Sequence, residues 1–432
     1  MAMTKHNDKQ TTQGRKDIFN DVRLAFEGDR TLWIIYAVLI TLSILVVYSS
    51  TAKMAYDITS KMSTTDALRT QIMFVLMSIP LIYFVHKTDY RLFRRFTPLM
   101  YYLFIGLTVA AYLFGSTTNG AARWLPIGPF QFQPSEGLKI MTILMLARCM
   151  EPRQVDINKL NLLPTSLRLG DEKQRRIIRE NTIPLIGPVI LSCGVILPAH
   201  TSSAVIIFMA SVIMLYIGRV STKEIAKFIV VMSAIGMLGL SAMSLVGMGR
   251  GDTAGGRLSS WISEWTTDGK CSSMSEMSDT QRAMVAIHNG SLFGEGAGHS
   301  TSRVVVIHPE SDYAYAFFVS EYGIITALLL MLLYLWIFFR SIEICRKCRT
   351  AFPMLMTAGL GLLITIQALL HILVQINIIP ETGQTLPLIS RGGTSMLFTS
   401  IAIGIIISVS RTNALTESET KKRQTKKEYN DE

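Results

Sequence analysis

Two charged residues lie three positions apart inside an apolar stretch of the chain. Glu136 and Lys139 fall within the segment 133–150, which is almost long enough to cross a bilayer. Residues three apart share one face of a helix, so these charges can pair. Ionisable groups inside apolar helices are costly and for that reason mark functional sites by default. The pair predicts either an anion-binding group or an ion pair that only holds helices together.

The start of the same segment has the features of an anion site. Pro134 suits the first turn of a helix, because its missing N–H would have had no partner there. The free amides of that turn, next to Gln133 and Ser135, and the positive end of the helix dipole favour an anion. Arg123 and Trp124 precede this helix, where such a pair serves either as a ligand contact or as an interfacial anchor.

A second helix start of the same kind follows a pair of glycines. The run Ser390, Arg391, Gly392 and Gly393 comes directly before an apolar segment. The glycines allow backbone amides to turn toward a ligand, as they do in anion-binding nests. The alternative is a tight turn that caps the helix.

Two acidic residues and two histidines complete the candidates. Asp312 stands where a long polar stretch meets an apolar segment, and Glu321 lies nine residues later. Asp312 is either a general base or a helix cap. His200 and His371 are each alone in apolar surroundings, and we interpret them as hydrogen-bonded polar residues, not as metal ligands.

Apolar helices must position these residues. Ten stretches approach the length that crosses a hydrocarbon core, at 31–50, 69–86, 97–114, 133–150, 181–198, 202–218, 225–247, 313–339, 353–378 and 391–410. We therefore expect an all-α, polytopic membrane protein with about ten transmembrane helices. Only residues 198–201 separate the fifth and sixth stretches, so one broken span and nine helices is the alternative.

Composition supports the membrane assignment. The chain of 432 residues is 49% hydrophobic and 17% charged, against roughly 25% charged in soluble domains. The net charge of +11 is explained by topology and does not predict nucleic-acid binding. With ten helices, 31 of the 42 Lys and Arg residues fall on the side that also holds both termini, which the positive-inside rule places in the cytoplasm. The five scattered cysteines predict no disulfide framework.

The helices divide the chain into three parts. Residues 1–30 form a cytoplasmic tail, residues 31–410 the transmembrane domain, and residues 411–432 a basic cytoplasmic tail. Both tails are charged and expected to be flexible. One large outer loop, 248–312, interrupts the domain, and a loop of this length is usually functional. Within it, Asp279 to His288 has helical character.

Four motifs, in this order on this topology, resemble those of the SEDS glycosyltransferases, the membrane polymerases of peptidoglycan, over residues 31–410. The motifs are Gly120-Ala-Ala-Arg123-Trp124 with Phe132-Gln-Pro-Ser-Glu136 and Lys139; Gln281 with Gly290, Gly294, Gly296, Gly298 and Ser300; Asp312 with Glu321 and Gly323; and Thr382-Gly-Gln-Thr-Leu-Pro387 with Ser390 and Gly392-Gly-Thr-Ser395. The residues of the fourth motif resemble those of the division branch, FtsW, more than those of the elongation branch, RodA.

The resemblance implies a reaction and its residues. The substrate would be lipid II, and glycan would pass from its undecaprenyl pyrophosphate to the 4-hydroxyl of the next sugar, with Asp312 as the catalytic base. The implied substrate-binding residues are Arg123, Trp124, Gln133, Ser135, Glu136, Lys139, Glu321, Ser390, Arg391, Gly392 and Gly393. A divalent cation, Mg²⁺ or Mn²⁺, would share in neutralising the pyrophosphate.

The resemblance also implies partners and a location. They are a class B penicillin-binding protein, which supplies the transpeptidase, and other division proteins at the septum of the bacterial inner membrane. A flippase for the same lipid and a non-catalytic division scaffold are the alternative functions.

The sequence departs from the family pattern at three places. Pro198-Ala-His200-Thr-Ser lacks the acidic residue that usually follows the proline. Either Val306-Ile307 or a shifted His308-Pro309 stands where Leu-Pro usually precedes the catalytic Asp, and Arg391 replaces a tyrosine. No role of the missing acidic group can therefore be carried over to this chain.

Overall fold

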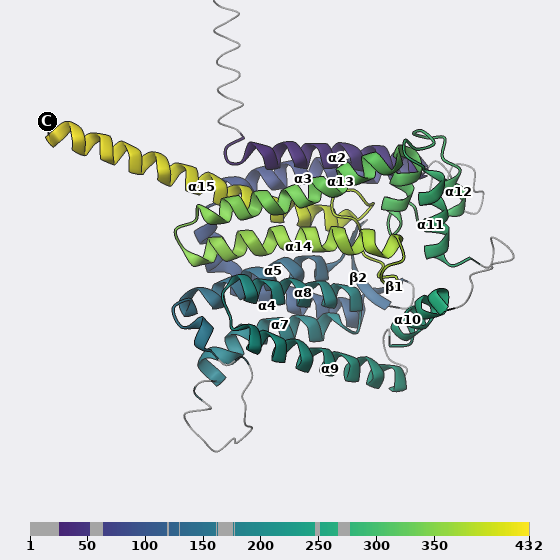
Figure 1. Cartoon of the computed structure of the whole chain (residues 1–432), viewed down its shortest axis with the longest axis horizontal. Helices are drawn as coiled ribbons and strands as arrows, with labels where there is room; N and C mark the ends of the chain where they lie inside the picture. Colours follow the sequence, from purple (N-terminus) through teal and green to yellow (C-terminus); the bar gives the residue numbers. More distant parts are fainter. Residues whose placement is uncertain are drawn as a thin grey trace, which may run out of the picture.

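The ten apolar segments all form helices. The structure, a computed structural model, describes residues 26–51, 64–118, 121–128, 130–160, 162, 176, 178–246, 251–266 and 277–431. The helices, shown in Figure 1, are α2 Arg30–Thr51, α3 Thr64–Lys87, α4 Tyr90–Phe114, α5 Pro134–Met150, α7 Ile183–Ile196, α8 Thr201–Ile217, α9 Thr222–Val246, α13 Ala314–Arg346, α14 Ala351–Gln375 and α15 Gly393–Asp431.

Seven of these helices are long and apolar enough to cross a membrane on their own. The other three, α5, α7 and α8, have 17, 14 and 17 residues and pack among the long ones. The expected all-α membrane fold is confirmed.

The fifth and sixth segments are two helices and not one broken span. α7 ends at Ile196, α8 begins at Thr201, and the two pack against each other. His200 caps α8, because its Nδ1 accepts the backbone N–H of Ser203 at 3.3 Å. The histidine thus satisfies a free amide of the first helical turn, where polar caps are preferred.

Two nearly fully buried helices form the centre of the bundle. Most residues of α14 and α5 have little exposure, and α14 contacts α5, α8, α13 and α15. A side chain at Gly359 would lie 2.6 Å from Ile143 of α5 and 2.8 Å from Met214 of α8. Glycine at this position therefore lets three helices approach closely.

One end of the bundle carries structure that the apolar pattern does not predict. An antiparallel sheet of β1 Ser116–Thr118, β2 Ala121–Ile127 and β3 Phe130–Phe132 joins α4 to α5, with β2 in the middle. In the described part of the large loop, three helices are present: α10 Gly251–Thr266, α11 Asp279–Asn289 and α12 Ser302–Val305. The helix expected near 279–288 is confirmed by α11. We call this end, which also holds Asp312, the Asp312 end.

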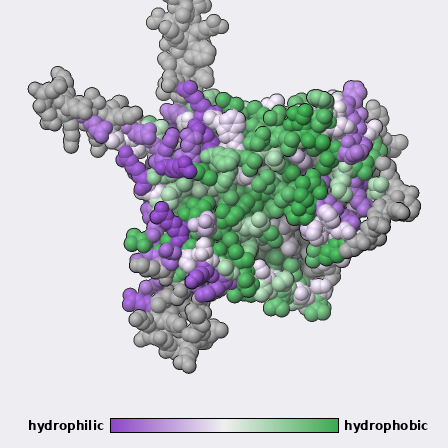
Figure 2. Space-filling model, in the orientation of Figure 1, coloured by the Kyte–Doolittle hydropathy of each residue, from purple (hydrophilic) through white to green (hydrophobic). Residues whose placement is uncertain are grey.

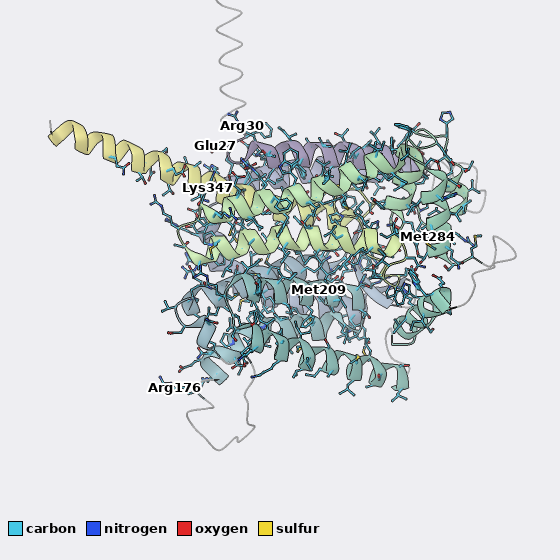
Figure 3. All side chains as sticks on the ribbon, viewed as in Figure 1. Glu27, Arg30, Arg176, Met209, Met284 and Lys347 are labelled. Carbon is cyan, nitrogen blue, oxygen red and sulfur yellow. The ribbon has the colours of Figure 1, made fainter. Side chains whose placement is uncertain are left out.

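The opposite end, which we call the tail end, holds the beginning of α2 and the continuation of α15. The chain was expected to leave its last transmembrane helix near residue 410, but α15 runs on to Asp431. Short helical turns occur here at Glu151–Arg153, Ile157–Lys159 and Ile178–Thr182. In Figure 3, Glu27, Arg30 and Lys347 lie at the tail end and Met284 at the Asp312 end. Residues 1–25, most of the expected N-terminal tail, lie outside the described residues.

The surface agrees with a bundle that spans a bilayer. Figure 2 shows a broad hydrophobic flank between hydrophilic side chains at the two ends of the helices. At the tail end, Arg340 of α13 pairs with Asp29 at 2.6 Å, and Arg411 of α15 and Lys87 of α3 both pair with Glu27. These ion pairs join the ends of four helices where charge is compatible with an interface.

Candidate functional site

Asp312 lies in a turn before α13 and does not cap it. The N-cap is Tyr313, which makes no side-chain cap hydrogen bond, and α13 begins at Ala314. The turn forms because the backbone amides of Ser311 and Tyr313 both donate to the carbonyl of His308, whose φ is +52°. The helix-cap interpretation of Asp312 is therefore wrong, and its carboxylate does not cap the helix.

Two neighbours hold this turn in place. Tyr313 and Ala316 pack on Ala283 and Ala286 of α11. From the other side, Ser390 Oγ donates to the carbonyl of Ser311 at 2.7 Å. The backbone N–H of Arg391 donates to the carbonyl of Glu310 at 2.7 Å. The loop before α15 is thus joined to the turn that carries Asp312.

Cationic side chains from two other elements interact electrostatically with Asp312. Arg123 of β2 and Arg257 of α10 both interact electrostatically with its carboxylate, as does His308. A methyl group at Gly383 would lie 4.0 Å from Asp312 Oδ2 and 4.0 Å from Nη1 and Nη2 of Arg257. Gly383 therefore leaves open the space between the acid and the guanidinium.

The surroundings of the turn shift the pKa values of its two acidic residues, Asp312 and Glu310, in opposite directions. Burial raises the pKa of Asp312, while His308, Arg123 and Arg257 lower it less strongly and Glu310 raises it. Burial also acts to raise the pKa of Glu310, but its hydrogen bond with His308 and nearby positive charge bring that pKa below the ordinary value. The hydrogen bond to Glu310 raises the pKa of His308. A carboxylate of raised pKa is a better proton acceptor than an ordinary aspartate.

An apolar groove lies beside the charged residues that surround Asp312. Its volume is about 660 Å³, and it lies between α8, α10 and α14. Its wall includes Val205, Met209 and Leu373, and Figure 3 shows Met209 about midway along the bundle. Its polar lining includes Arg257, which pairs with Glu381 at 3.8 Å. The groove thus combines a long apolar wall with a charged group next to Asp312.

Glu136 and Lys139 form a buried ion pair deeper in the bundle. Their side chains join at 2.8 Å with exposures of 8% and 2%, and Lys139 Nζ also donates to Gln367 Oε1 at 2.9 Å. Gln367 Nε2 donates to the carbonyl of Thr385 at 3.1 Å. The cation predicted from the sequence to bind an anion therefore has two protein partners, one of which holds the loop before α15.

The other predicted residues at the start of α5 and before it are buried or half-buried. Gln133 precedes α5 without a side-chain cap bond, and its Nε2 donates to Ser135 Oγ at 3.2 Å. Arg123 and Trp124 are half-buried neighbours on β2. At the second helix start, Ser390 is buried, Arg391 and Gly392 are half-buried, and Gly393 begins α15.

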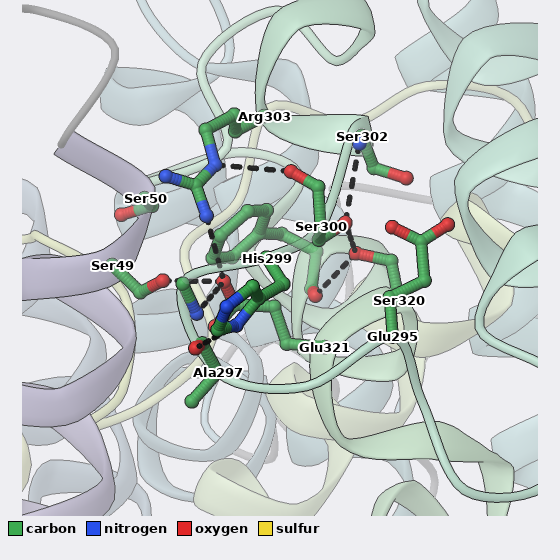
Figure 4. A network of polar contacts seen from close by, with 12 residues as sticks. Ser49, Ser50, Glu295, Ala297, His299, Ser300, Ser302, Arg303, Ser320 and Glu321 are labelled. Atoms are coloured by element: carbon green, nitrogen blue, oxygen red, sulfur yellow. Dashed lines mark hydrogen bonds and ion pairs between the residues drawn. The ribbon is translucent and has the colours of Figure 1, made fainter.

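Glu321 serves a different part of the same end. As Figure 4 shows, its Oε1 accepts hydrogen bonds from Ser49 of α2 and from the backbone N–H of Gly298, the latter at 3.0 Å. Arg303 lies 3.8 Å from the same oxygen. Glu321 therefore holds the glycine-rich segment against α13.

The glycine-rich segment needs its glycines at the contact with α13. Gly323 interrupts the helical conformation of α13 with φ +82° and ψ 170°. A methyl group there would lie 2.3 Å from the carbonyl oxygen of Leu292, and one at Gly294 would lie 2.2 Å from that of Glu321. Both positions have a positive φ and a backbone contact that no side chain would tolerate.

The structure thus brings together some of the predicted residues and adds others. Asp312, Arg123, Ser390 and Arg391 meet around one turn, whereas Glu321 belongs to a neighbouring network. Both histidines are hydrogen-bonded polar residues, as expected, and both interact with Gln384. Arg257, His308 and Gln375 were missed. The amphipathic spacing of Leu258, Ile262 and Trp265 is the signal that could have identified α10 and with it Arg257.

Known proteins of the same kind match nearly the whole chain. The family model described as cell cycle protein, which covers FtsW, RodA and SpoVE, matches residues 29–415. Stage V sporulation protein E of Bacillus subtilis (strain 168) is 27% identical over 89% of this chain and 97% of its own length. The peptidoglycan glycosyltransferase MrdB of Escherichia coli (strain K12) is 26% identical over 88% of this chain and 93% of its own length.

Solved structures share the fold. A chain from a peptidoglycan synthase complex, described as coordinating polymerization and crosslinking, covers 89% of this chain and 98% of its own with a TM-score of 0.65 at 18% identity. The rod shape determining protein RodA of Thermus thermophilus covers 89% and 97% with a TM-score of 0.56 at 19% identity. With its helices, motifs and family match in agreement, the chain belongs to the FtsW/RodA/SpoVE family of cell cycle proteins.

Proposed function

We propose that this protein is a peptidoglycan glycosyltransferase that polymerises lipid II at the outer face of the bacterial inner membrane. The 4-hydroxyl oxygen of the incoming sugar attacks the anomeric carbon of the growing glycan. The bond from that carbon to the undecaprenyl pyrophosphate breaks, and the pyrophosphate leaves with the electron pair. Asp312 accepts the proton of the hydroxyl group.

The observation that carries this proposal is the position of Asp312 beside a groove of mixed character. An apolar groove of about 660 Å³ suits a polyprenyl chain, and Arg257 lies between the groove and the carboxylate. Arg123 and Arg257 supply positive charge for a leaving pyrophosphate, with Lys139 as a third cation deeper in the bundle. A base, cations and a lipid-sized groove at one place are the parts this reaction needs.

Relatives support the reaction class. Besides MrdB, the matching proteins include probable peptidoglycan glycosyltransferases FtsW, such as that of Thioalkalivibrio sulfidiphilus (strain HL-EbGR7), 26% identical over 69% of this chain and 68% of its own length. Because relatives named stage V sporulation protein E, FtsW and MrdB match at similar identity, the division role rests on the Thr382-Gly-Gln-Thr motif.

The proposal includes a partner and a topology. The related chain of known structure belongs to a complex that also crosslinks, which supports a class B penicillin-binding protein as the partner of this protein. Other division proteins at the septum complete the expected surroundings. The Asp312 end faces outward, and both termini lie in the cytoplasm.

A divalent cation is proposed to bind together with the substrate. Among the residues that the structure describes, no three His, Cys, Asp or Glu side chains converge on a metal-sized space. We propose that Mg²⁺ or Mn²⁺ binds the pyrophosphate oxygens, whose charge such ions commonly neutralise. Removal of free divalent ions with a chelator, followed by titration of each ion in the polymerisation assay, tests this role.

The experiment that tests the function is polymerisation of lipid II by the purified chain, alone and with its partner. Asp312→Asn keeps the shape of the side chain and removes its basicity. We expect glycan polymerisation to fall by about 10² to 10⁴, because a positioned base contributes about that factor. Thermal stability and partner binding should stay near wild type.

The alternatives give different results in the same assay. A flippase would move lipid II across vesicle membranes without forming glycan, and a scaffold would do neither. Asp312→Asn with more than about half of the wild-type activity would exclude the base role, since a lost general base cannot cost so little. Glu310 would then become the next candidate.

A further inference from the structure

A row of three buried polar side chains follows one face of α14. Gln367, His371 and Gln375 are spaced four residues apart and are 5%, 2% and 0% exposed. Residues four apart lie above one another on a helix, so the three form a continuous row. Polar groups in the middle of an apolar bundle must find hydrogen-bond partners, and the partners of this row lie in the segments that form the candidate site.

Each member of the row bonds one backbone carbonyl of the loops at the Asp312 end. The three hydrogen bonds run from Gln367 Nε2 to Thr385 O at 3.1 Å, from His371 Nδ1 to Gln384 O at 2.7 Å, and from Gln375 Nε2 to Asp312 O at 3.3 Å. The first two carbonyls belong to the loop that borders the groove, and the third belongs to the proposed base itself. One rigid helix therefore determines how these two segments lie relative to each other.

The members of the row are also bonded to one another and to the start of α13. Gln375 Oε1 accepts the backbone N–H of Ala316, and Gln375 Nε2 donates to His371 Nε2. This network assigns the proton of His371 to Nδ1, because that nitrogen faces a carbonyl. Both sides of the Asp312 turn, its carbonyl and the first turn of α13, are thus held by one amide side chain.

The network continues to the opposite wall of the groove. Gln384 Nε2 donates to Ser203 Oγ at 3.1 Å and lies 3.1 Å from His200 Nδ1, both at the start of α8. Hydrogen bonds in such chains polarise and support one another. The chain of bonds therefore links α8, the loop before α15, α14 and Asp312 in a single connected network.

We propose that Gln375 and His371 are positioning residues that fix the carboxylate of Asp312 relative to the loop 382–387. Neither residue contacts a reacting atom; both act through backbone carbonyls. The inference rests on the proposed function, since it assumes that the place of Asp312 matters for a proton transfer. A displacement of about 1 Å in a catalytic group can cost about 10²-fold in rate.

The first test uses Gln375→Met, which keeps the length of the side chain and removes its hydrogen bonds. In polymerisation assays with lipid II, we expect kcat to fall by about 10- to 100-fold, because the base is no longer held in place. KM should change by less than about threefold, because the groove and its cations are untouched. Gln375→Leu is the second variant: its side chain has neither a donor for Asp312 nor an acceptor for Ala316, so kcat should fall in the same way.

Thr357→Val is the matched control on the same helix. Thr357 is 0% exposed, and its hydroxyl has no hydrogen-bond partner among the described residues. This variant removes a buried polar group of α14 near the tail end, so kcat and KM should both equal those of wild type. A general loss of α14 packing would affect the control and the Gln375 variants alike.

The second test asks whether the two residues act as one unit. His371→Leu should also lower kcat, and the double variant His371→Leu, Gln375→Met should be no slower than the slower single variant. Losses that multiply in the double variant, or a Gln375→Met enzyme with wild-type kcat, would overturn the inference. So would a rise in KM that accounts for the whole loss.

A measurement without substrate separates this inference from the proposed function. Amide hydrogen exchange of a peptide containing Ala316 should be faster in Gln375→Met than in wild type and unchanged in Thr357→Val; equal exchange in all three would refute the positioning role. Wild type and Asp312→Asn are assayed in parallel. An inactive wild type would contradict the proposed function, whereas an active wild type and an inactive Asp312→Asn with an unimpaired Gln375→Met would contradict only the inference.

Discussion

Asp312 is set among titratable and cationic groups that come from three separate elements. His308 and Glu310 share its turn, Arg123 comes from β2, and Arg257 comes from α10. As the proposed general base, Asp312 must be ionised to accept a proton, so the rate should rise with pH through its pKa. Because burial raises that pKa above the ordinary value of 3.8, the acid limb of the pH profile should lie above this value.

The first prediction concerns His308. Its positive charge lowers the pKa of Asp312, so His308→Asn should raise that pKa further and move the acid limb of kcat/KM to higher pH. The measurement is the pH profile of lipid II polymerisation. His288→Asn on α11, where the side chain is exposed, is the control and should leave the limb in place. A limb that moves to lower pH would mean that a different group titrates.

The second prediction concerns the buried pair. Lys139→Met leaves the carboxylate of Glu136 buried without a partner, which should destabilise the protein by about 3–5 kcal/mol. Glu136→Gln with Lys139→Met should restore most of the stability, measured by thermal unfolding in detergent. We expect polymerisation by this double variant to stay below about a tenth of wild type, because the site loses a cation and Gln367 loses its charged donor.

The outcome of that double variant distinguishes two roles. If both stability and activity return to wild type, Glu136 and Lys139 form an ion pair that only holds helices together. If stability returns alone, the charge of Lys139 contributes to the reaction.

At the scale of elements, the break in α13 fixes the glycine-rich segment. Gly323→Ala would place a methyl group 2.3 Å from the carbonyl of Leu292 at a φ of +82°. We expect a lower unfolding temperature and at least about a tenfold loss of polymerisation, because a strained backbone position costs about 1–3 kcal/mol before the contact itself is counted. Both are measured on the purified protein.

Gly106→Ala in α4 is the matched substitution for Gly323→Ala. A methyl group at Gly106 would have no neighbour within 4 Å among the residues that the structure describes. Alanine in a helix interior is favoured over glycine by about 0.5–1 kcal/mol, so this variant should be as stable as wild type or slightly more stable. A Gly323→Ala protein that behaves like Gly106→Ala would show that the close contact can relax.

At the scale of the whole molecule, the described helices place the start of α2 and the C-terminal part of α15 on the same side. The sequence predicts that this side is cytoplasmic. In a variant that lacks the native cysteines, Ala297→Cys should react with an impermeant thiol reagent in intact spheroplasts, because position 297 is exposed at the Asp312 end. Val155→Cys, at a position that is 92% exposed at the tail end, should react only after permeabilisation. The reverse pattern would invert the topology.

The helices themselves were predictable from the sequence. A segment that crosses a membrane must satisfy its backbone hydrogen bonds internally, so its length and apolar composition suffice to identify it. Glu136, Lys139 and Asp312 were predictable as candidates for a related reason, since charge is rare in or beside such segments and therefore conspicuous.

The other parts of the candidate site depend on contacts between segments that are far apart in the sequence. Three short strands lie between α4 and α5 in a segment without a sheet-like pattern, and they place Arg123. Arg257 lies more than fifty residues before Asp312, and nothing local indicates that a helix of the large loop brings the two together. In the sequence, Gln367, His371 and Gln375 show no sign of a shared role. Only the structure shows that all three hold loops of the candidate site.

The sequence by itself therefore determined the membrane-spanning elements, because each follows from local hydrogen bonding and local apolarity. It also identified Glu136, Lys139 and Asp312 as ionisable candidates, because charge is rare in or beside apolar segments. Only the tertiary structure decided that Asp312 lies in a turn and not on a helix cap, and that α14 holds its carbonyl through Gln375. The physical reason is that side-chain hydrogen bonds between segments depend on packing, which no local pattern specifies.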